Sequence, residues 1–258
     1  MGLTPATQDG RFRVTRVQKS VFAQGERRLL NWLCAKMPPW IMPDHLTVIG
    51  VGGSVLVFTS YVASGDSALW LWAASFGFIV HWFGDSLDGS LARHRHIERP
   101  IYGYFLDHTV DAICNLMIMV GLGFTPWVRM DVALFTLIGY YLLCIYVFIN
   151  NHVSGVFQLS FLGFGPTEIR LALIAINVWM FFDGRNGFTI NGQSFTYYDL
   201  LLLFAGMMFT AVFIVRMLAG IRELRDSARS GAAAPSAIAF PSTGPGQSAS
   251  RKASSAAK

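Results

Sequence analysis

The amino-acid sequence predicts an all-α membrane protein, in which a bundle of six transmembrane helices follows an amphipathic surface helix. Hydrophobic residues make up 53% of the 258 residues, and charged residues make up 14%. Soluble domains carry about a quarter charged residues, so this chain is unusually poor in charge. The mean hydropathy is +0.46. Apolar runs close to the length of about 20 residues that crosses a bilayer recur along most of the chain.

This composition argues against a soluble globule, a disordered chain and a disulfide-stapled secreted module. The three cysteines, Cys34, Cys114 and Cys144, are too scattered to form a metal cage or a disulfide framework. They are expected to be small apolar residues within helices. We expect membrane lipids to surround the protein, and we expect no nucleic-acid partner.

The first predicted element is an amphipathic helix over residues 21–37. Leu29, Leu30 and Leu33 recur at helical spacing, while Arg28 and Lys36 fall on the other side. This pattern is typical of a helix that lies on the membrane surface. A cytosolic helix packed against the domain is an equally good interpretation.

Six apolar runs follow, and each is expected to form one span. They cover residues 46–64, 67–92, 102–124, 132–150, 168–182 and 197–219. The breaks between them carry turn residues, and within the break at 183–196 the Asn-Gly pair of FTINGQSFT predicts a small β-hairpin.

The distribution of basic residues predicts the orientation of the spans, because positively charged loops stay on the cytoplasmic side. With both termini inside, Arg129 and Arg185 are the only members of the 20 lysines and arginines that fall in outer loops. We therefore expect a cytosolic segment over 1–40, a membrane domain over 41–222 and a disordered basic cytosolic tail over 223–258.

Four carboxylates occur where a bilayer should exclude charge. Asp85 and Asp88 are three residues apart on the second predicted span, and Asp107 and Asp111 are four apart on the third, so each pair shares a helix face. A short cytosolic turn joins the two spans, and the pairs can therefore face each other.

Four converging carboxylates cannot all stay ionised without cations. Oxygen ligands suit Mg²⁺, Mn²⁺ or Ca²⁺, and paired metal ions are typical of phosphoryl chemistry. The structural alternative is a set of ion pairs with Arg93, Arg95 or Arg99. Small residues beside the carboxylates, Gly89 and Gly103, allow a ligand or a neighbouring backbone to approach closely.

These residues spell D-x2-D-G-x2-A-R-x9-G-x3-D-x3-D from Asp85 to Asp111, which resembles the signature of the CDP-alcohol phosphotransferase family. The segment PDHLTVIG over 43–50 resembles the family's P-N-x-L-T segment, with Asp44 where asparagine is usual. The resemblance covers roughly residues 40–220 and implies six spans, a cytosol-facing polar cavity, two divalent metal ions (Mg²⁺ or Mn²⁺) and a homodimer.

By position, the resemblance also implies roles for individual residues. The four aspartates would be the metal ligands, and Asp111 would be the general base. The residues expected to hold the CDP moiety are Asp85, Gly89, Ala92, Arg93 and Gly103. The reaction would release CMP as an alcohol oxygen attacks the β-phosphorus of a CDP-linked donor.

The family has two branches, which differ in whether the donor or the acceptor carries the lipid. Two features favour the choline and ethanolamine phosphotransferases, which use a lipid acceptor such as diacylglycerol. His108 makes the motif D-H-x-x-D, and Glu168 in GPTEIR resembles a Val-Thr-Glu segment of those enzymes. His108 is therefore a candidate base, and Glu168 is a candidate catalytic residue. Alternatively, His108 bonds a backbone carbonyl, and Glu168 pairs with Arg170 or caps its helix.

The alternative function is a CDP-diacylglycerol-dependent phosphatidyltransferase that acts on a small polar alcohol. An acceptor that already carries phosphate needs a basic pocket, and residues 151–167 contain no lysine or arginine, although Arg170 and Arg216 could serve. A transporter and an inactive scaffold are the non-enzyme alternatives. His81 lies four residues before Asp85 and could reach the cavity, or could be satisfied inside the bundle. The tail and the 183–196 hairpin suggest a bacterial inner-membrane protein.

Overall fold

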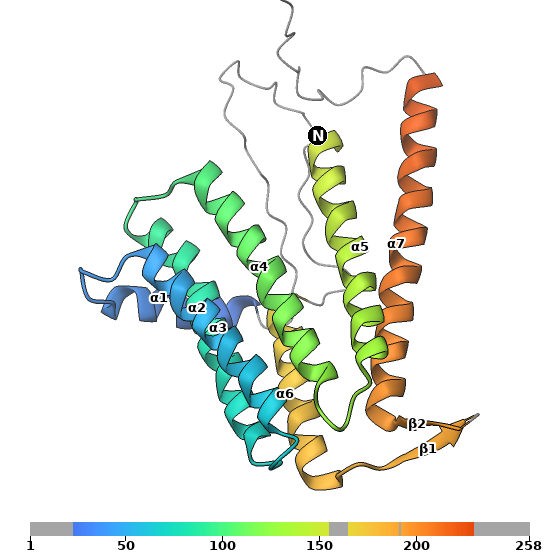
Figure 1. The fold of residues 1–258 in the computed structure, drawn as a ribbon. Coiled ribbons are helices and arrows are strands. Elements are labelled where there is room, and N and C mark those ends of the chain that lie inside the picture. The colour runs from blue at the N-terminus through green and yellow to red at the C-terminus, as the bar shows by residue number, and fades with distance from the viewer. Residues whose placement is uncertain (1–22, 155–164, 191, 230–258) are drawn as a thin grey trace, which may run out of the picture.

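The computed structural model describes residues 23–154, 165–190 and 192–229, and these residues form an all-α bundle with one small hairpin (Figure 1). The elements in chain order are α1 (Ala23–Lys36), α2 (Pro43–Ala63), α3 (Trp70–His94), α4 (Pro100–Gly123), α5 (Met130–Ser154), α6 (Pro166–Asp183), β1 (Gly187–Ile190), β2 (Gln193–Thr196) and α7 (Tyr197–Arg229). The predicted all-α class is confirmed.

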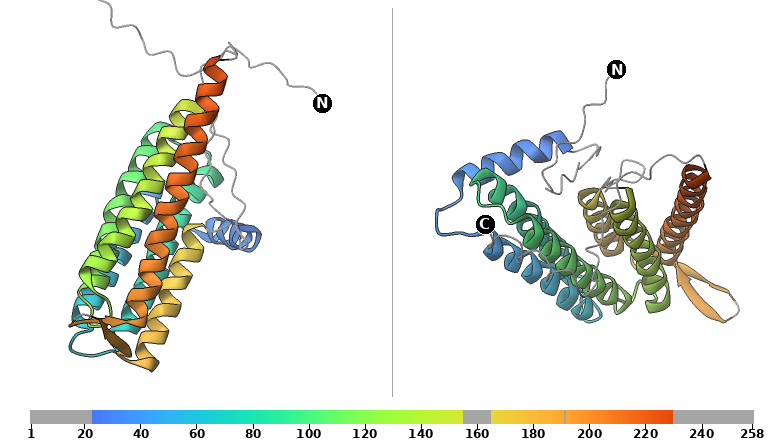
Figure 2. Two further views of the ribbon diagram at one scale, coloured as in Figure 1. Left: turned by 90° about the vertical axis from the view of Figure 1, so that its right-hand side faces the viewer. Right: turned by 90° about the horizontal axis from the view of Figure 1, so that it is seen from above.

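The long helices alternate in direction, so that successive connections fall at opposite ends of the bundle (Figure 1). Seen from above, α2, α3 and α4 form one group, while α5, α6 and α7 form the other (Figure 2). Contacts of α3 with α6 and of α4 with α5 join the two groups. The connection between α3 and α4 lies at one end of the bundle, and the β1–β2 hairpin lies at the other.

Three of these helices begin with a proline at their first position, namely α2 at Pro43, α4 at Pro100 and α6 at Pro166. Proline suits this position because the first N–H groups of a helix have no partner inside the helix. The observed starts of these helices are therefore two or three residues earlier than the apolar runs predict.

The closest helix pair is α2 with α3, and glycines on both helices make this approach possible. A Cβ atom built on Gly53 would lie 2.9 Å from the carbonyl oxygen of Gly77, and one built on Gly77 would lie 3.0 Å from the carbonyl oxygen of Gly53. Small residues at such crossings allow helix backbones to touch. The contact fixes α2 against the half of α3 that leads to Asp85.

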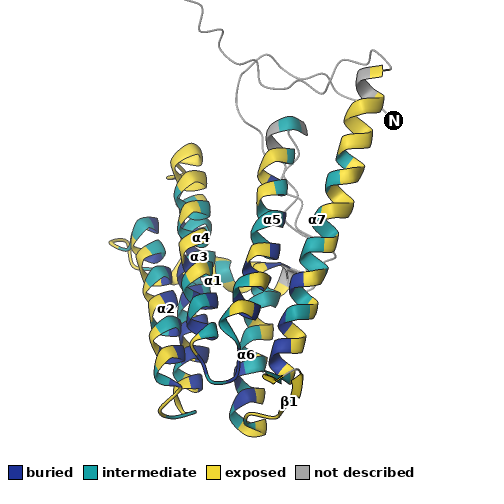
Figure 3. Cartoon of the chain, turned by 45° about the vertical axis from the view of Figure 1, so that its right-hand side comes forward, coloured by how far each residue is buried: buried dark blue, intermediate teal, exposed yellow. Residues whose placement is uncertain are grey.

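Within the part of the chain that the structure describes, four helices are long and apolar enough to cross a membrane: α2, α4, α5 through Asn150, and α7 through Asp226. Many large apolar side chains of the described helices are exposed, and exposed positions recur along the long helices (Figure 3). Such a surface is typical of helices that face lipid rather than water. Neither α3 nor α6 meets the same criterion, so the predicted count of six spans stays a prediction.

The helix α1 lies crosswise to the bundle (Figure 2). Leu30, Leu33 and Cys34 pack against Leu87 and Leu91 of α3. On the remaining surface of α1, the Trp32 ring is 53% exposed and Lys36 lies over it at 4.2 Å from the ring centroid. Both sequence interpretations of this helix stay open, because packing on the domain leaves a tryptophan and basic residues facing outward. Most of the predicted tail and residues 1–22 lie outside the described residues.

The predicted hairpin is present, and a buried carboxylate ties it to the neighbouring helices. Strands β1 and β2 pair antiparallel, with Gly187 opposite Thr196. Asp199 is 1% exposed and accepts hydrogen bonds from the backbone N–H groups of Thr196 and Arg129, both at 2.8 Å. The N–H of Asp199 donates to Thr196 Oγ1 at 3.1 Å, which completes a capping box at the start of α7. One side chain therefore joins the hairpin, α7 and the residue before α5.

Replacing Asp199 with alanine is expected to lower the thermal unfolding temperature of the detergent-solubilised protein. Two backbone N–H groups would lose their acceptor, at a cost of about 1–3 kcal/mol for each one left buried. Asp131→Ala is the matched control, because Asp131 is exposed and its ion pair with Arg129 is of the kind that contributes at most about 1 kcal/mol. Equal unfolding temperatures for the two variants would contradict the anchoring role of Asp199.

Candidate active site

A pocket near the α3–α4 end of the bundle collects three of the four predicted carboxylates. It contains about 220 Å³ of space, part of it open to solvent. The residues that line it come from α2, α3 and α4, and they are Thr47, Gly50, Val51, His81, Asp85, Asp88, Asp107 and Val110. The fourth carboxylate, Asp111, is within hydrogen-bonding reach of Asp85. The structure therefore brings together the two pairs that helical spacing had placed on facing surfaces.

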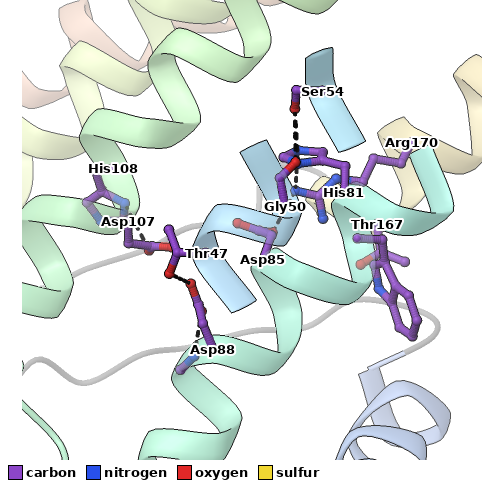
Figure 4. A network of polar contacts seen from close by, with 12 residues as sticks. Thr47, Gly50, Ser54, His81, Asp85, Asp88, Asp107, His108, Thr167 and Arg170 are labelled. Carbon is purple, nitrogen blue, oxygen red and sulfur yellow. Dashed lines mark hydrogen bonds and ion pairs between the residues drawn. The ribbon is translucent and has the colours of Figure 1, made fainter. Parts of the chain in front are cut away.

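Asp88 is held by α2 as well as by its own helix. Thr47 Oγ1 donates to Asp88 Oδ2 at 2.7 Å, and the backbone N–H of Gly89 donates to Asp88 Oδ1 at 2.5 Å (Figure 4). The sequence alone indicates no role for Thr47. The signal that could have found it is its place at the end of the PDHLT segment, which precedes the first predicted span.

Asp85 forms an ion pair with Arg170, which belongs to α6. Arg170 Nη2 donates to Asp85 Oδ2 at 2.6 Å, and the side chains are 11% and 20% exposed respectively. This contact joins residues 85 positions apart in the sequence. The sequence offers Arg170 as a partner for Glu168 or for a phosphate-bearing acceptor, so its pairing with the carboxylate cluster is a finding of the structure.

The arginines that had been considered as partners of the cluster have other contacts. Arg95 donates hydrogen bonds to four backbone carbonyl groups, those of Met37, Pro38, Pro39 and Ile41. Arg99 pairs with Asp44 at 2.5 Å, and this hydrogen bond raises the pKa of Arg99. Arg93 is exposed and donates to Ser90 Oγ at 3.2 Å. In the described structure, an ion pair with the cluster is formed by Arg170 of α6.

On α4, Asp107, His108 and Asp111 form a second close group. One potential ligand atom from each lies within 4.8 Å of the others. His108 Nδ1 is 3.3 Å from Asp107 Oδ2 (Figure 4). The imidazole packs against the rings of Tyr104 and Phe148, with centroid separations of 4.3 Å and 5.1 Å. These contacts hold His108 beside the carboxylates.

The donor set fits divalent metal ions. Asp85 and Asp111 approach within hydrogen-bonding reach, and Asp107 lies in the same cluster. Arg170 supplies one positive charge to this cluster through its ion pair with Asp85. Carboxylates this close need further positive charge to remain ionised together, and hard divalent cations with oxygen ligands supply it. The four aspartates and His108 are therefore candidate ligands.

The residues predicted to hold CDP adjoin this cluster without filling it. Gly89 and Arg93 lie one turn apart, and a Cβ atom built on Gly89 would lie 3.3 Å from Arg93 Nη1. Ala92 is half-buried next to Arg93. Gly103 lies in the first turn of α4, and a Cβ atom built there would meet no atom within 4 Å. Among the described residues, helix packing therefore does not explain a glycine at 103, which leaves room for a ligand there.

Glu168 is placed differently from the other candidates. Its Oε2 accepts a hydrogen bond from the backbone N–H of Gly165 at 2.9 Å, which caps the start of α6. The structure thus shows the helix-capping interpretation for one carboxylate oxygen. The other oxygen, Oε1, is buried and has no hydrogen-bond partner within the described ranges. Glu168 does not line the pocket described above.

The fold and the site together define an integral membrane protein in which apolar helices enclose a carboxylate cluster suited to divalent metal ions. The sequence profile of the CDP-alcohol phosphatidyltransferase family matches residues 40–216. The chain belongs to this family, and the resemblance noted in the sequence is confirmed. Members of the family are phosphotransferases that use a CDP-alcohol donor, an alcohol acceptor and divalent metals.

Curated relatives from two branches of the family are similar to parts of the chain. It is 28% identical to human cholinephosphotransferase 1 over 168 residues, which are 60% of this chain and 39% of the relative. It is 25% identical to the mouse cholinephosphotransferase 1 over 186 residues, or 67% and 44% of the two chains. It is 33% identical to a phosphatidylinositol phosphate synthase of Cutibacterium acnes over 103 residues, or 39% and 46%. Each match spans less than half the length of the relative.

Adding Mn²⁺ to metal-free protein is expected to raise its thermal unfolding temperature, because an ion that binds only the folded state stabilises it. Asp107→Asn should remove most of this shift, since it deletes a ligand charge from the cluster. Asp44→Asn is the control, because Asp44 pairs with Arg99 away from the pocket lining. A full Mn²⁺ shift in Asp107→Asn would show that the ion binds elsewhere.

Proposed function

We propose that the protein transfers a substituted phosphate group from a CDP-alcohol to an acceptor hydroxyl and releases CMP. The donor is of the CDP-choline or CDP-ethanolamine type, and the acceptor is a lipid alcohol such as diacylglycerol. The observation that carries the proposal is the meeting of Asp85, Asp88, Asp107 and Asp111 at one end of an apolar bundle. Such a cluster is suited to phosphoryl transfer next to a lipid phase.

In this proposal the four aspartates hold two divalent ions, either Mg²⁺ or Mn²⁺. Once bound, the ions would supply positive charge against the pyrophosphate of the donor and the departing CMP. Thr47 fixes the direction of Asp88, and Arg170 fixes that of Asp85. The CDP moiety binds at the open side of the cluster, in contact with Asp85, Gly89, Ala92, Arg93 and Gly103.

The acceptor oxygen attacks the β-phosphorus, and a base removes its proton as the bond to CMP breaks. His108 can serve as this base. Its Nδ1 faces the Asp107 carboxylate, which only accepts hydrogen bonds when ionised, so Nδ1 carries the proton and Nε2 carries the lone pair. Asp111 is the alternative base. Glu168 remains a catalytic candidate through its buried Oε1, although its other oxygen caps α6.

The topology proposed for this activity has six spans, with α3 and α6 completing the set of four that meet the length and hydropathy criteria. The polar end of α3, which carries Asp85 and Asp88, would lie at the cytoplasmic surface. Residues 1–40 and 223–258 would then be cytosolic and 41–222 would form the membrane domain, with α1 at the surface of a bacterial inner membrane. The homodimer implied by the family resemblance stays a prediction.

A second function is favoured by Arg170. A guanidinium at the site offers a partner for a phosphate-bearing acceptor, as a CDP-diacylglycerol-dependent phosphatidyltransferase requires. The similarity to a phosphatidylinositol phosphate synthase belongs to the same alternative. A transporter or an inactive scaffold would also retain membrane carboxylates, but neither would release CMP.

The deciding experiment measures CMP release by the purified protein in nanodiscs with Mg²⁺ or Mn²⁺. CDP-choline, CDP-ethanolamine and CDP-diacylglycerol are each offered with matching acceptors. We expect release from a CDP-amino-alcohol with diacylglycerol, and a loss of at least about 100-fold in Asp88→Asn, which lacks one ligand charge. Asp44→Asn should retain activity. Release only from CDP-diacylglycerol would favour the alternative, and undiminished release by Asp88→Asn would refute the metal assignment.

His108→Ala is expected to lower kcat by about 100-fold or more, the range typical of losing a general base. His94→Ala is the control, because His94 is exposed at the end of α3. Thermal unfolding first checks that the two variants are equally stable, and both are then compared in the CMP-release assay. A loss of less than about threefold in His108→Ala would assign the base to Asp111 instead.

A further inference from the structure

A buried string of polar groups connects α2, α3 and α6 just below the carboxylate cluster. Its centre is His81, which is 3% exposed and lies one helical turn before Asp85. The ring nitrogen Nδ1 lies 3.1 Å from the carbonyl oxygen of Gly50 and 3.1 Å from Ser54 Oγ. The other nitrogen, Nε2, lies 3.3 Å from Arg170 Nη2 (Figure 4). Each end of the imidazole therefore contacts a different helix.

These contacts fix the tautomer of His81. A backbone carbonyl oxygen can only accept a hydrogen bond, so Nδ1 must carry the hydrogen that faces Gly50. A guanidinium can only donate, so Nε2 must carry a lone pair toward Arg170. The ring is therefore neutral with its hydrogen on Nδ1. The Ser54 hydroxyl can adapt to this arrangement because it both donates and accepts.

The same contacts account for both hydrogens on one nitrogen of Arg170. One Nη2 hydrogen points to Asp85 Oδ2 at 2.6 Å, and the other points to His81 Nε2. With two acceptors in fixed positions, the planar guanidinium has little freedom to rotate. The orientation of the Asp85 carboxylate then follows from that of Arg170. The hydrogen bond from Arg170 is accepted by Asp85 Oδ2 and not by Oδ1.

The string depends on the close approach of α2 to α3. A Cβ atom built on Gly50 would lie 3.2 Å from the backbone nitrogen of Asp85 and 3.5 Å from the carbonyl oxygen of His81. The absence of a side chain at Gly50 thus lets its carbonyl group reach the imidazole. A larger residue there would push α2 away and lengthen the first hydrogen bond of the string.

We propose that His81 is a positioning residue for the transfer reaction. Its Nδ1–H tautomer, set by the Gly50 carbonyl, orients Arg170, and Arg170 in turn holds the Asp85 carboxylate in the direction that the donor pyrophosphate site requires. The effect on catalysis rests on the proposed function, whereas the tautomer and the Arg170 contact do not. Groups that orient a ligand side chain in this way typically change activity by about 10-fold to 100-fold when they are removed.

Two amide substitutions separate positioning from simple packing. In His81→Gln the side-chain oxygen can take the place of Nε2 and accept from Arg170. In His81→Asn the shorter amide can still donate to the Gly50 carbonyl but cannot reach Arg170. We expect His81→Asn to lower kcat by about 10-fold to 100-fold with little change in KM for the CDP donor. His81→Gln should stay within about threefold of the unmodified protein. Thermal unfolding of both variants checks that the bundle is intact.

A measurement that needs no activity completes the test. Nitrogen NMR of metal-free protein labelled with ¹⁵N-histidine reports which ring nitrogen carries the hydrogen, and the His81→Gln spectrum assigns the signal among the six histidines. We expect His81 to be protonated at Nδ1 only. A hydrogen on Nε2 would overturn the proposal, as would equal kcat in two equally stable amide variants. If no variant releases CMP from any donor, the proposed function fails, while the NMR result still decides the tautomer.

Discussion

The constraint on which this structure depends is the presence of four carboxylates at one end of an apolar helix bundle. Charge is costly in such surroundings unless it is paired, metal-bound or exposed to water. Two carboxylates are stabilised by the protein itself: Asp85 by its ion pair with Arg170, and Asp88 by its hydrogen bond from Thr47. The remaining negative charge requires bound cations, and the arrangement therefore suits metal-dependent chemistry. The close packing of α2 on α3 also stabilises the cluster, because it brings Thr47 and the Gly50 carbonyl close to the carboxylates.

The stabilising core lies in the other half of the bundle. A large cluster of buried side chains, including Tyr61, Phe78, Leu122 and Tyr198, gathers the helices near the hairpin end. The capping box at the start of α7 and Asp199 reinforce that end. The carboxylate end has a smaller apolar cluster that includes Leu46, Leu87 and Leu91, together with glycine contacts and polar pairs between helices. The fold thus separates a large apolar core at the hairpin end from the polar pocket at the other end.

The sequence predicted the helices and the carboxylate cluster because both follow from local spacing. The observed helices start within about four residues of the predicted runs. The helix α7 extends to Arg229, beyond the end of its predicted run, because its last turns are polar and the prediction relied on apolar residues. Residues i, i+3 and i+4 identify the two aspartate pairs directly. Arg170 could not be assigned to Asp85 in this way, because the contact joins distant helices and the nearer Arg93, Arg95 and Arg99 looked equally suitable. The capping contact of Glu168 was foreseen as one alternative, but periodicity alone could not select it.

The role of Arg170 bears on the choice between the two reaction directions. Both hydrogens on its Nη2 are accepted by His81 and Asp85, and its charge is balanced by a carboxylate 2.6 Å away. A guanidinium engaged in this way attracts an acceptor phosphate less strongly than a free one does. None of the described residues that line the pocket is a lysine or an arginine. These contacts therefore favour the proposed acceptor without phosphate over one that carries it. In the proposed reaction, the imidazole of His108, held against Asp107, would take the hydroxyl proton of this acceptor.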